Sequence, residues 1–113
     1  MVLSHPKAGS SWEGFVIEQV LATEPHDGAW FWATHQGAGI DLILQRDGRL
    51  YGVECKRADV PRVTPSIRNA LDDLGLERVM VVYPGEKRFA LADRVQAVPM
   101  RALAEPGRLF EGG

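Results

Sequence analysis

The sequence of 113 residues predicts an α/β fold in which helices pack against a mixed β-sheet. Residues 39–57 read as two strands joined at Asp47-Gly48, and Asp-Gly between alternating apolar runs is a strong hairpin signal. Residues 64–74 have a helical pattern and are followed by the apolar run RVMVVY at residues 78–83. A strand, a helix and a second apolar strand in this order favour a parallel crossover. Parallel and antiparallel pairs are therefore expected in one sheet.

The first helix is expected to follow an entry segment of residues 1–9. Ser10 and Glu13 have the spacing of a capping box, in which the Glu side chain bonds back to the backbone of the capping residue. The apolar residues of this helix are expected to centre on one broad face, namely Trp12, Phe15, Val16, Ile17, Val20 and Leu21. Glu13 falls inside the same arc, where a carboxylate needs a partner. Two roles therefore remain open for Glu13, the capping box and a contact with the hairpin.

Residues 29–34, AWFWAT, are expected to form a strand whose aromatic side chains pack in the core. The glycine-rich residues 35–39 match no phosphate-binding loop, so they are expected to connect this strand to the next as a hairpin. His35 in this loop either faces solvent or lies at the edge of a site.

The second helix is expected to begin at Thr64-Pro65, with Thr64 as the N-cap, and to end at Gly75. Two short strands, residues 89–91 and 95–98, are expected to form a small C-terminal β extension. A helical turn at residues 100–104 and a tail at residues 105–113 follow. Neither a repeat nor a linker divides the sequence, so one domain over residues 1–113 is expected.

The composition is that of an ordinary globular domain, with 45% hydrophobic and 25% charged residues. No apolar run reaches the length of a membrane span, so no membrane partner is expected. Cys55 is the one cysteine, which excludes an internal disulfide and is consistent with a cytoplasmic location. The net charge of −2 argues against strong electrostatic binding of nucleic acid. It does not exclude a metal-dependent phosphodiesterase, because a metal site needs acidic residues.

The hairpin brings two carboxylates together. If Asp47 and Gly48 are the central residues of a two-residue turn, the expected pairs are Arg46 with Arg49, Leu44 with Tyr51, Leu42 with Val53 and Asp41 with Glu54. Lys56 lies on the same face, whereas Cys55 points to the opposite face and is expected to be buried. Two carboxylates about 5 Å apart repel by roughly 3 kcal/mol at an effective dielectric of about 20. Lys56, a bound cation or solvent must offset this repulsion.

The order helix, three strands, helix, strand, with Glu13, Asp41 and Glu54-Cys55-Lys56 in these elements, resembles the PD-(D/E)XK nuclease superfamily. More narrowly, residues 6–103 look like the C-terminal domain of unknown function attached to bacterial AAA-type ATPases. The resemblance implies a restriction-endonuclease-like αβββαβ core with the small C-terminal β extension. It also implies an AAA-type ATPase as a partner, although no ATP-binding Gly-x-x-x-x-Gly-Lys-Ser/Thr loop occurs in this sequence.

The chemistry expected at this patch is phosphodiester hydrolysis with Mg²⁺ or Mn²⁺. Asp41 and Glu54 supply the hard oxygen ligands that such cations prefer. Lys56 can orient water or stabilise charge that develops on the phosphate, and Glu13 would act in the second shell or at a second ion. Three basic residues that follow the hairpin are candidate contacts for nucleic acid or simply solvated surface, namely Arg57, Arg62 and Arg68.

Two other interpretations of the patch stay open at this point. The chain can be a non-catalytic module of nuclease fold that binds an AAA-type ATPase or forms a homodimer. Alternatively, the patch is structural, with Lys56 neutralising Asp41 and Glu54. A melting shift with divalent cations separates the catalytic interpretation from the structural one.

Overall fold

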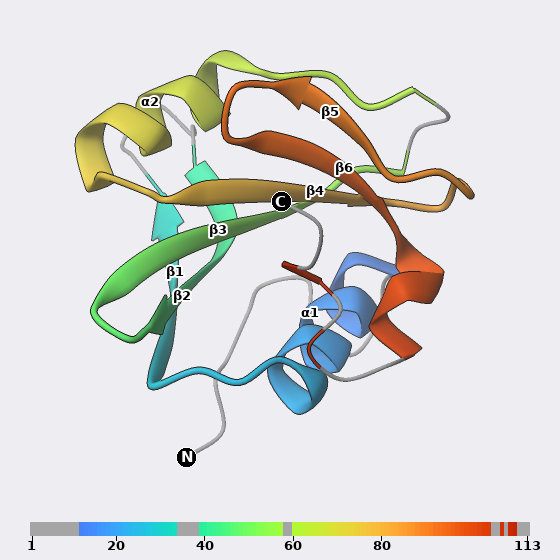
Figure 1. Ribbon diagram of the computed structural model, residues 1–113, viewed down its shortest axis with the longest axis horizontal. Coiled ribbons are helices and arrows are strands. Elements are labelled where there is room, and N and C mark those ends of the chain that lie inside the picture. Colours follow the sequence, from blue (N-terminus) through green and yellow to red (C-terminus); the bar gives the residue numbers. More distant parts are fainter. Residues whose placement is uncertain (1–11, 34–38, 58–59, 105–106, 108, 111–113) are drawn as a thin grey trace.

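Six strands form one mixed sheet in the order β1-β2-β3-β4-β6-β5. The computed structural model describes residues 12–33, 39–57, 60–104, 107 and 109–110 (Figure 1). In chain order, the elements are α1 (Trp12–Thr23), β1 (Gly28–Ala33), β2 (Gly39–Arg46), β3 (Arg49–Cys55), α2 (Pro65–Leu74), β4 (Arg78–Tyr83), β5 (Phe89–Ala92), β6 (Val95–Pro99) and the 3-10 helix η1 (Met100–Ala104).

The sheet combines antiparallel and parallel pairs, as predicted. β1, β2 and β3 are antiparallel neighbours, whereas β3 with β4 and β4 with β6 are parallel. The parallel crossover from β3 through α2 to β4 is therefore confirmed. The two short C-terminal strands extend this sheet beyond β4, with β6 next to β4 and β5 at the edge. Val95, Ala97 and Val98 of β6 are apolar and buried.

The turn between β2 and β3 fixes the register of the hairpin. Asp47 and Gly48 have φ values of 54° and 77°, and two positive φ angles in a two-residue loop define a type I′ turn. The predicted pairs Arg46–Arg49, Leu44–Tyr51 and Leu42–Val53 are all present.

The two helices cover opposite faces of the sheet (Figure 1). The α1 face of the core contains Cys55, which is buried as predicted. α2 has the predicted caps: the Thr64 hydroxyl oxygen accepts a hydrogen bond from the Ile67 amide, and Gly75 ends the helix in the left-handed conformation. None of the described helices has the length and apolar character needed to cross a bilayer.

Two of the aromatic residues expected in the core are exposed. Phe15 is 48% exposed, while Val16, Ile17 and Val20 are buried against the sheet. At 3.6 residues per turn, Phe15 lies about 150° around the helix from the centre of these three residues, so it faces away from the sheet. Trp30 on the edge strand β1 is also exposed. The prediction that these two side chains pack in the core was wrong.

The end of the chain is part of the core where the structure describes it. Leu109 is completely buried on the α1 face, and Phe110 packs against the same cluster. Glu24, which follows α1, accepts a hydrogen bond from the Gly107 amide at 3.0 Å, and Arg88 donates to the Leu109 carbonyl at 3.1 Å. Burial raises the pKa of the Glu24 carboxyl. Within the expected tail of residues 105–113, Leu109 and Phe110 therefore pack on the α1 face of the sheet.

Candidate active site

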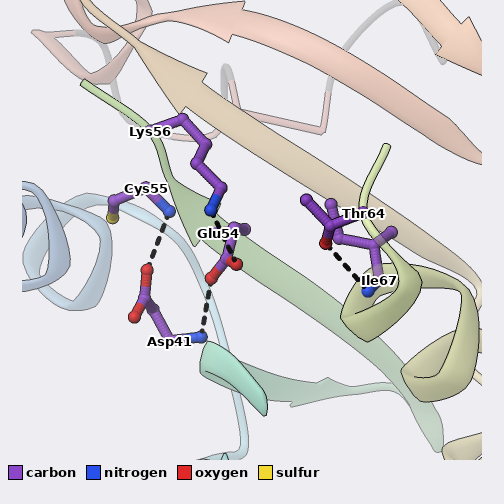
Figure 2. Close-up of polar contacts among 6 residues, drawn as sticks. All are labelled: Asp41, Glu54, Cys55, Lys56, Thr64 and Ile67. Carbon is purple, nitrogen blue, oxygen red and sulfur yellow. Dashed lines mark hydrogen bonds and ion pairs between the residues drawn. The ribbon is translucent and has the colours of Figure 1, made fainter. Parts of the chain in front are cut away.

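Asp41 and Glu54 meet where β2 and β3 separate. The last regular pair of the two strands at this end is Leu42 with Val53. Beyond it, the Asp41 amide donates to Glu54 Oε1 at 3.1 Å, and the Cys55 amide donates to Asp41 Oδ2 at 2.9 Å (Figure 2). Each side-chain oxygen thus accepts a hydrogen bond from a backbone amide of the neighbouring strand, which a backbone carbonyl would accept in a regular ladder. The predicted Asp41–Glu54 pair is therefore not part of the regular ladder, but the structure does bring these two side chains together.

A β-bulge lies in β2 at this position. From Trp30 to Trp32, β1 advances two residues, while its partners in β2 advance three, from Ile43 to Ile40. Ile40 packs on the α2 face of the sheet but Leu42 packs on the α1 face, so the alternation of side chains breaks between them. Bulges re-aim side chains and are common beside functional sites. This bulge includes Asp41.

The sequence interpretation missed this bulge. A strand that is buried on both faces is apolar at nearly every position, which hides a break in alternation. The consecutive apolar residues 42–44 were the only local sign of a bulge in the sequence, and they fit a regular buried strand equally well.

Glu54 is a buried acid with one basic neighbour. Glu54 is only 7% exposed to solvent. Lys56 Nζ lies 3.8 Å from Glu54 Oε2 (Figure 2). Burial raises the pKa of Glu54 to about 8, and the negative charge of Asp41 and a hydrogen bond with the Asp41 side chain act in the same direction. Lys56 lowers this pKa, but its contribution is smaller than the effect of burial. Glu54 therefore holds its proton near neutral pH.

The first turn of α1 lies beside the end of β3. Cys55 Sγ is 4.0 Å from the backbone carbonyl oxygen of Glu13. Among the described residues, no three or more His, Cys, Asp or Glu side chains gather closely enough to hold a metal ion, so Glu13 is not grouped with Asp41 and Glu54. Ser10, the other half of the predicted capping box, lies outside the described residues, as does His35.

The three candidate nucleic-acid contacts are all exposed but occupy different places. Arg57 directly follows Lys56, and its guanidinium carbon lies 5.9 Å from the centre of the Trp12 ring. Arg62 precedes α2, and Arg68 lies within that helix. Of these three arginines, Arg57 is therefore nearest to Glu54 in the sequence.

The donor set fits a hard divalent cation. Mg²⁺ prefers oxygen ligands, retains several of its waters, and is held in many enzymes by only one or two carboxylates together with substrate phosphates. Asp41 and Glu54 provide two carboxyl groups on adjacent strands, and a cation would offset the repulsion between their ionised forms. Mn²⁺ has the same preference for oxygen.

The raised pKa of Glu54 predicts how the stability of the metal-free protein depends on pH. The folded state holds the Glu54 proton up to about pH 8, whereas the unfolded chain releases it near 4.5. The resulting stabilisation is fully present below pH 4.5 and is lost as pH rises through 8. Its slope is roughly −1.4 kcal/mol per pH unit in the free energy of unfolding.

Urea denaturation between pH 5 and 8 measures this slope. The difference in unfolding free energy between the wild type and Glu54→Gln isolates the contribution of Glu54, because glutamine does not titrate. We expect this difference to shrink steadily towards pH 8. A difference that is constant or grows with pH would contradict the raised pKa.

A family model described as "Domain of unknown function (DUF4143)" matches residues 8–103. Two similar proteins are the "Uncharacterized protein Rv2008c" of Mycobacterium tuberculosis strain H37Rv and the "Uncharacterized protein Mb2031c" of Mycobacterium bovis strain AF2122/97. Each is 46% identical over 107 residues, which cover 95% of this chain but 24% of the relative. The chain thus spans about a quarter of the length of these relatives, and no solved structure matches it. Since the family model covers most of the sequence, the chain belongs to the DUF4143 family of domains.

Proposed function

We propose that this domain is a metal-dependent phosphodiesterase of the PD-(D/E)XK nuclease type that acts on DNA or RNA. The observation that carries the proposal is the carboxyl pair of Asp41 and Glu54, with Lys56 next to it, at the point where β2 and β3 separate. The six-stranded mixed sheet with one helix on each face is compatible with a restriction-endonuclease-like core.

Asp41 and Glu54 would hold Mg²⁺ or Mn²⁺. When bound, the cation supplies Lewis-acid stabilisation of the phosphate and lowers the pKa of water. Glu54 would give up its proton when the site holds a cation, because a nearby positive charge favours the ionised carboxylate. The backbone hydrogen bonds from the Asp41 and Cys55 amides hold one oxygen of each carboxylate in place. This fixed geometry orients the ligands before the substrate arrives.

Lys56 has the position of a group that stabilises charge. Its ammonium is within 3.8 Å of Glu54 and is partly accessible to solvent, so it can reach a substrate bound at the same edge. An ammonium aimed at the phosphate stabilises the negative charge that grows on the oxygens in the transition state. Arg57, the next residue, is exposed and can contact an adjacent phosphate.

A second candidate function is that of a non-catalytic nuclease-fold module within a larger assembly. It is favoured by the mycobacterial relatives, in which the matched region makes up 24% of the length. In this alternative the domain binds an AAA-type ATPase or a second copy of itself, and the carboxyl pair with Lys56 is structural.

The test of the proposed function combines cation binding with cleavage. We expect Mg²⁺ or Mn²⁺ to raise the melting temperature of the wild type and to support cleavage of plasmid DNA, single-stranded DNA or RNA, with no cleavage in EDTA. Asp41→Asn should lose both effects, because it removes one ligand charge. If the melting temperature of the wild type does not respond to either cation and no substrate is cut, the proposal fails in favour of the structural interpretation.

A further inference from the structure

We propose that two copies of this chain associate through β1, with a two-fold axis at Phe31 that joins their sheets edge to edge. β1 is an edge strand, because β2 is its only neighbour in the described sheet (Figure 1). The outer side of an edge strand is a template for pairing with another strand. The inference is independent of the proposed cleavage, since it uses neither Asp41 nor Glu54.

The backbone of β1 presents its outward groups at Trp30 and Trp32. The Asp27 amide donates to the Gln45 carbonyl of β2 at 2.7 Å, so the backbone groups of Asp27 face β2. Successive residues of an antiparallel strand alternate between facing the neighbouring strand and facing away from it. The amides and carbonyls of Gly28, Trp30 and Trp32 are therefore directed away from β2.

The sequence of β1 is its own complement under a two-fold axis. Residues 29–33 read Ala-Trp-Phe-Trp-Ala in both directions. In an antiparallel pair centred on Phe31, Trp30 of each copy lies opposite Trp32 of the second copy, and a two-fold interface requires this kind of reciprocal match. Both Trp30–Trp32 pairs use the outward backbone groups, so each exchanges its two N–H···O bonds.

The side chains of this pairing match as well. Trp32 packs against the α2-face cluster, whereas Ala29 and Phe31 pack on the α1 face. Alternation places Trp30 on the same face as Trp32. Trp30 is 37% exposed, and its ring would meet the Trp32 ring of the second copy, because side chains directly opposite each other lie about 5 Å apart at Cβ. Aromatic pairs at such distances are favourable.

Charge distinguishes this edge from the opposite one. β1 contains neither a charged residue nor proline, the usual protections of an edge strand. The two-fold axis puts the Asp27 carboxylates of the two copies at opposite ends of the interface, roughly 27 Å apart, where they do not repel measurably. The other edge strand, β5, has only four residues and is flanked by Arg88 and Asp93. Self-association is therefore expected at β1 and not at β5.

The small size of this contact sets the expected affinity. The paired strands involve residues 29–33 of each copy, far fewer than the roughly 20–30 residues per side of a standard interface. We therefore expect a weak dimer with a dissociation constant on the order of 10–100 μM. Because the contact contains no ion pair, its affinity should depend little on salt.

The test is sedimentation velocity of the full chain from about 1 μM to 1 mM, a range that brackets the expected dissociation constant. Wild type should change from monomer to dimer. Trp30→Lys should weaken dimerisation by about tenfold or more, because it removes a ring pair and puts a charge on the edge. Phe89→Lys is the matched control, since Phe89 is an exposed aromatic residue on β5 and is 40% exposed. It should dimerise like the wild type.

Hydrogen exchange locates the contact. The Trp30 and Trp32 amides should exchange more slowly at high than at low protein concentration, whereas the amides of β5 should not respond. Melting curves check that each variant is folded. If Trp30→Lys does not fold, Trp30→Thr takes its place, because threonine suits a strand and also removes the ring pair.

Several results would overturn the inference. A wild type that remains monomeric at about 1 mM would do so, because the expected dissociation constant lies well below this concentration. A folded Trp30 variant that dimerises like the wild type would do so as well. A dimer that Phe89→Lys abolishes, or one without concentration-dependent protection in β1, would place the contact elsewhere and refute the assignment to β1.

Discussion

Lys56→Ala is expected to lower metal-dependent cleavage by roughly 100-fold or more, because removal of one group that stabilises transition-state charge has an effect of this size. Binding of the substrate should change much less, since Arg57 remains. The side chain of Lys56 is 38% exposed, so its loss leaves no cavity in the core. The rate should be measured under single-turnover conditions at saturating Mg²⁺, which separates chemistry from binding.

Lys87→Ala is the matched control, because Lys87 is an exposed lysine in the loop that follows β4. It should cleave like the wild type. Lys56→Arg should recover part of the activity, since it keeps the charge but not the geometry of an ammonium. Equal rates for wild type and Lys56→Ala would remove Lys56 from the catalytic set and leave it as the ion-pair partner of Glu54.

Leu109→Ala is expected to destabilise the protein by about 2–5 kcal/mol. Leu109 is completely buried among residues of α1, β2 and β4, so alanine leaves a cavity in the core. The loss is a large fraction of the total stability of a domain of this size. Urea denaturation of the full chain, followed by tryptophan fluorescence, measures it.

Val60→Ala serves as the comparison, because Val60 is 70% exposed. Its free energy of unfolding should lie within about 0.5 kcal/mol of the wild type. If Leu109→Ala is as stable as Val60→Ala, residues after η1 do not contribute to the core in solution.

Local signals were sufficient to predict most of the elements. The hairpin register follows from Asp47-Gly48 alone, because these residues accept the positive φ angles that a type I′ turn requires. The limits of α2 follow from Thr64 and Gly75 in the same way. The proximity of Asp41 and Glu54 was predictable from this register across a short separation in sequence. The bulge at Asp41, where hydrogen bonds between side chain and backbone replace the regular pair, was not predictable in this way.

Contacts between distant residues were not predictable. The burial of Leu109 depends on Glu24 and Arg88, which bind the backbone near the end of the chain but belong to separate segments. Nothing in the residues around Leu109 indicates such partners. The exposure of Phe15 could have been predicted from the sequence, because Phe15 lies far around the helix from Val16 and Val20 and so falls outside the buried stripe.

The reciprocal hydrogen bonds between β2 and β3 make two backbone amides sensitive to the state of the carboxyl pair. The Asp41 and Cys55 amides donate to carboxylate oxygens rather than to backbone carbonyls. A ligand that draws these oxygens away would loosen both amides and leave the regular ladder from Leu42 onward intact. Hydrogen exchange at these two positions would then report occupancy of the pair directly, whether or not any bond in a substrate is broken.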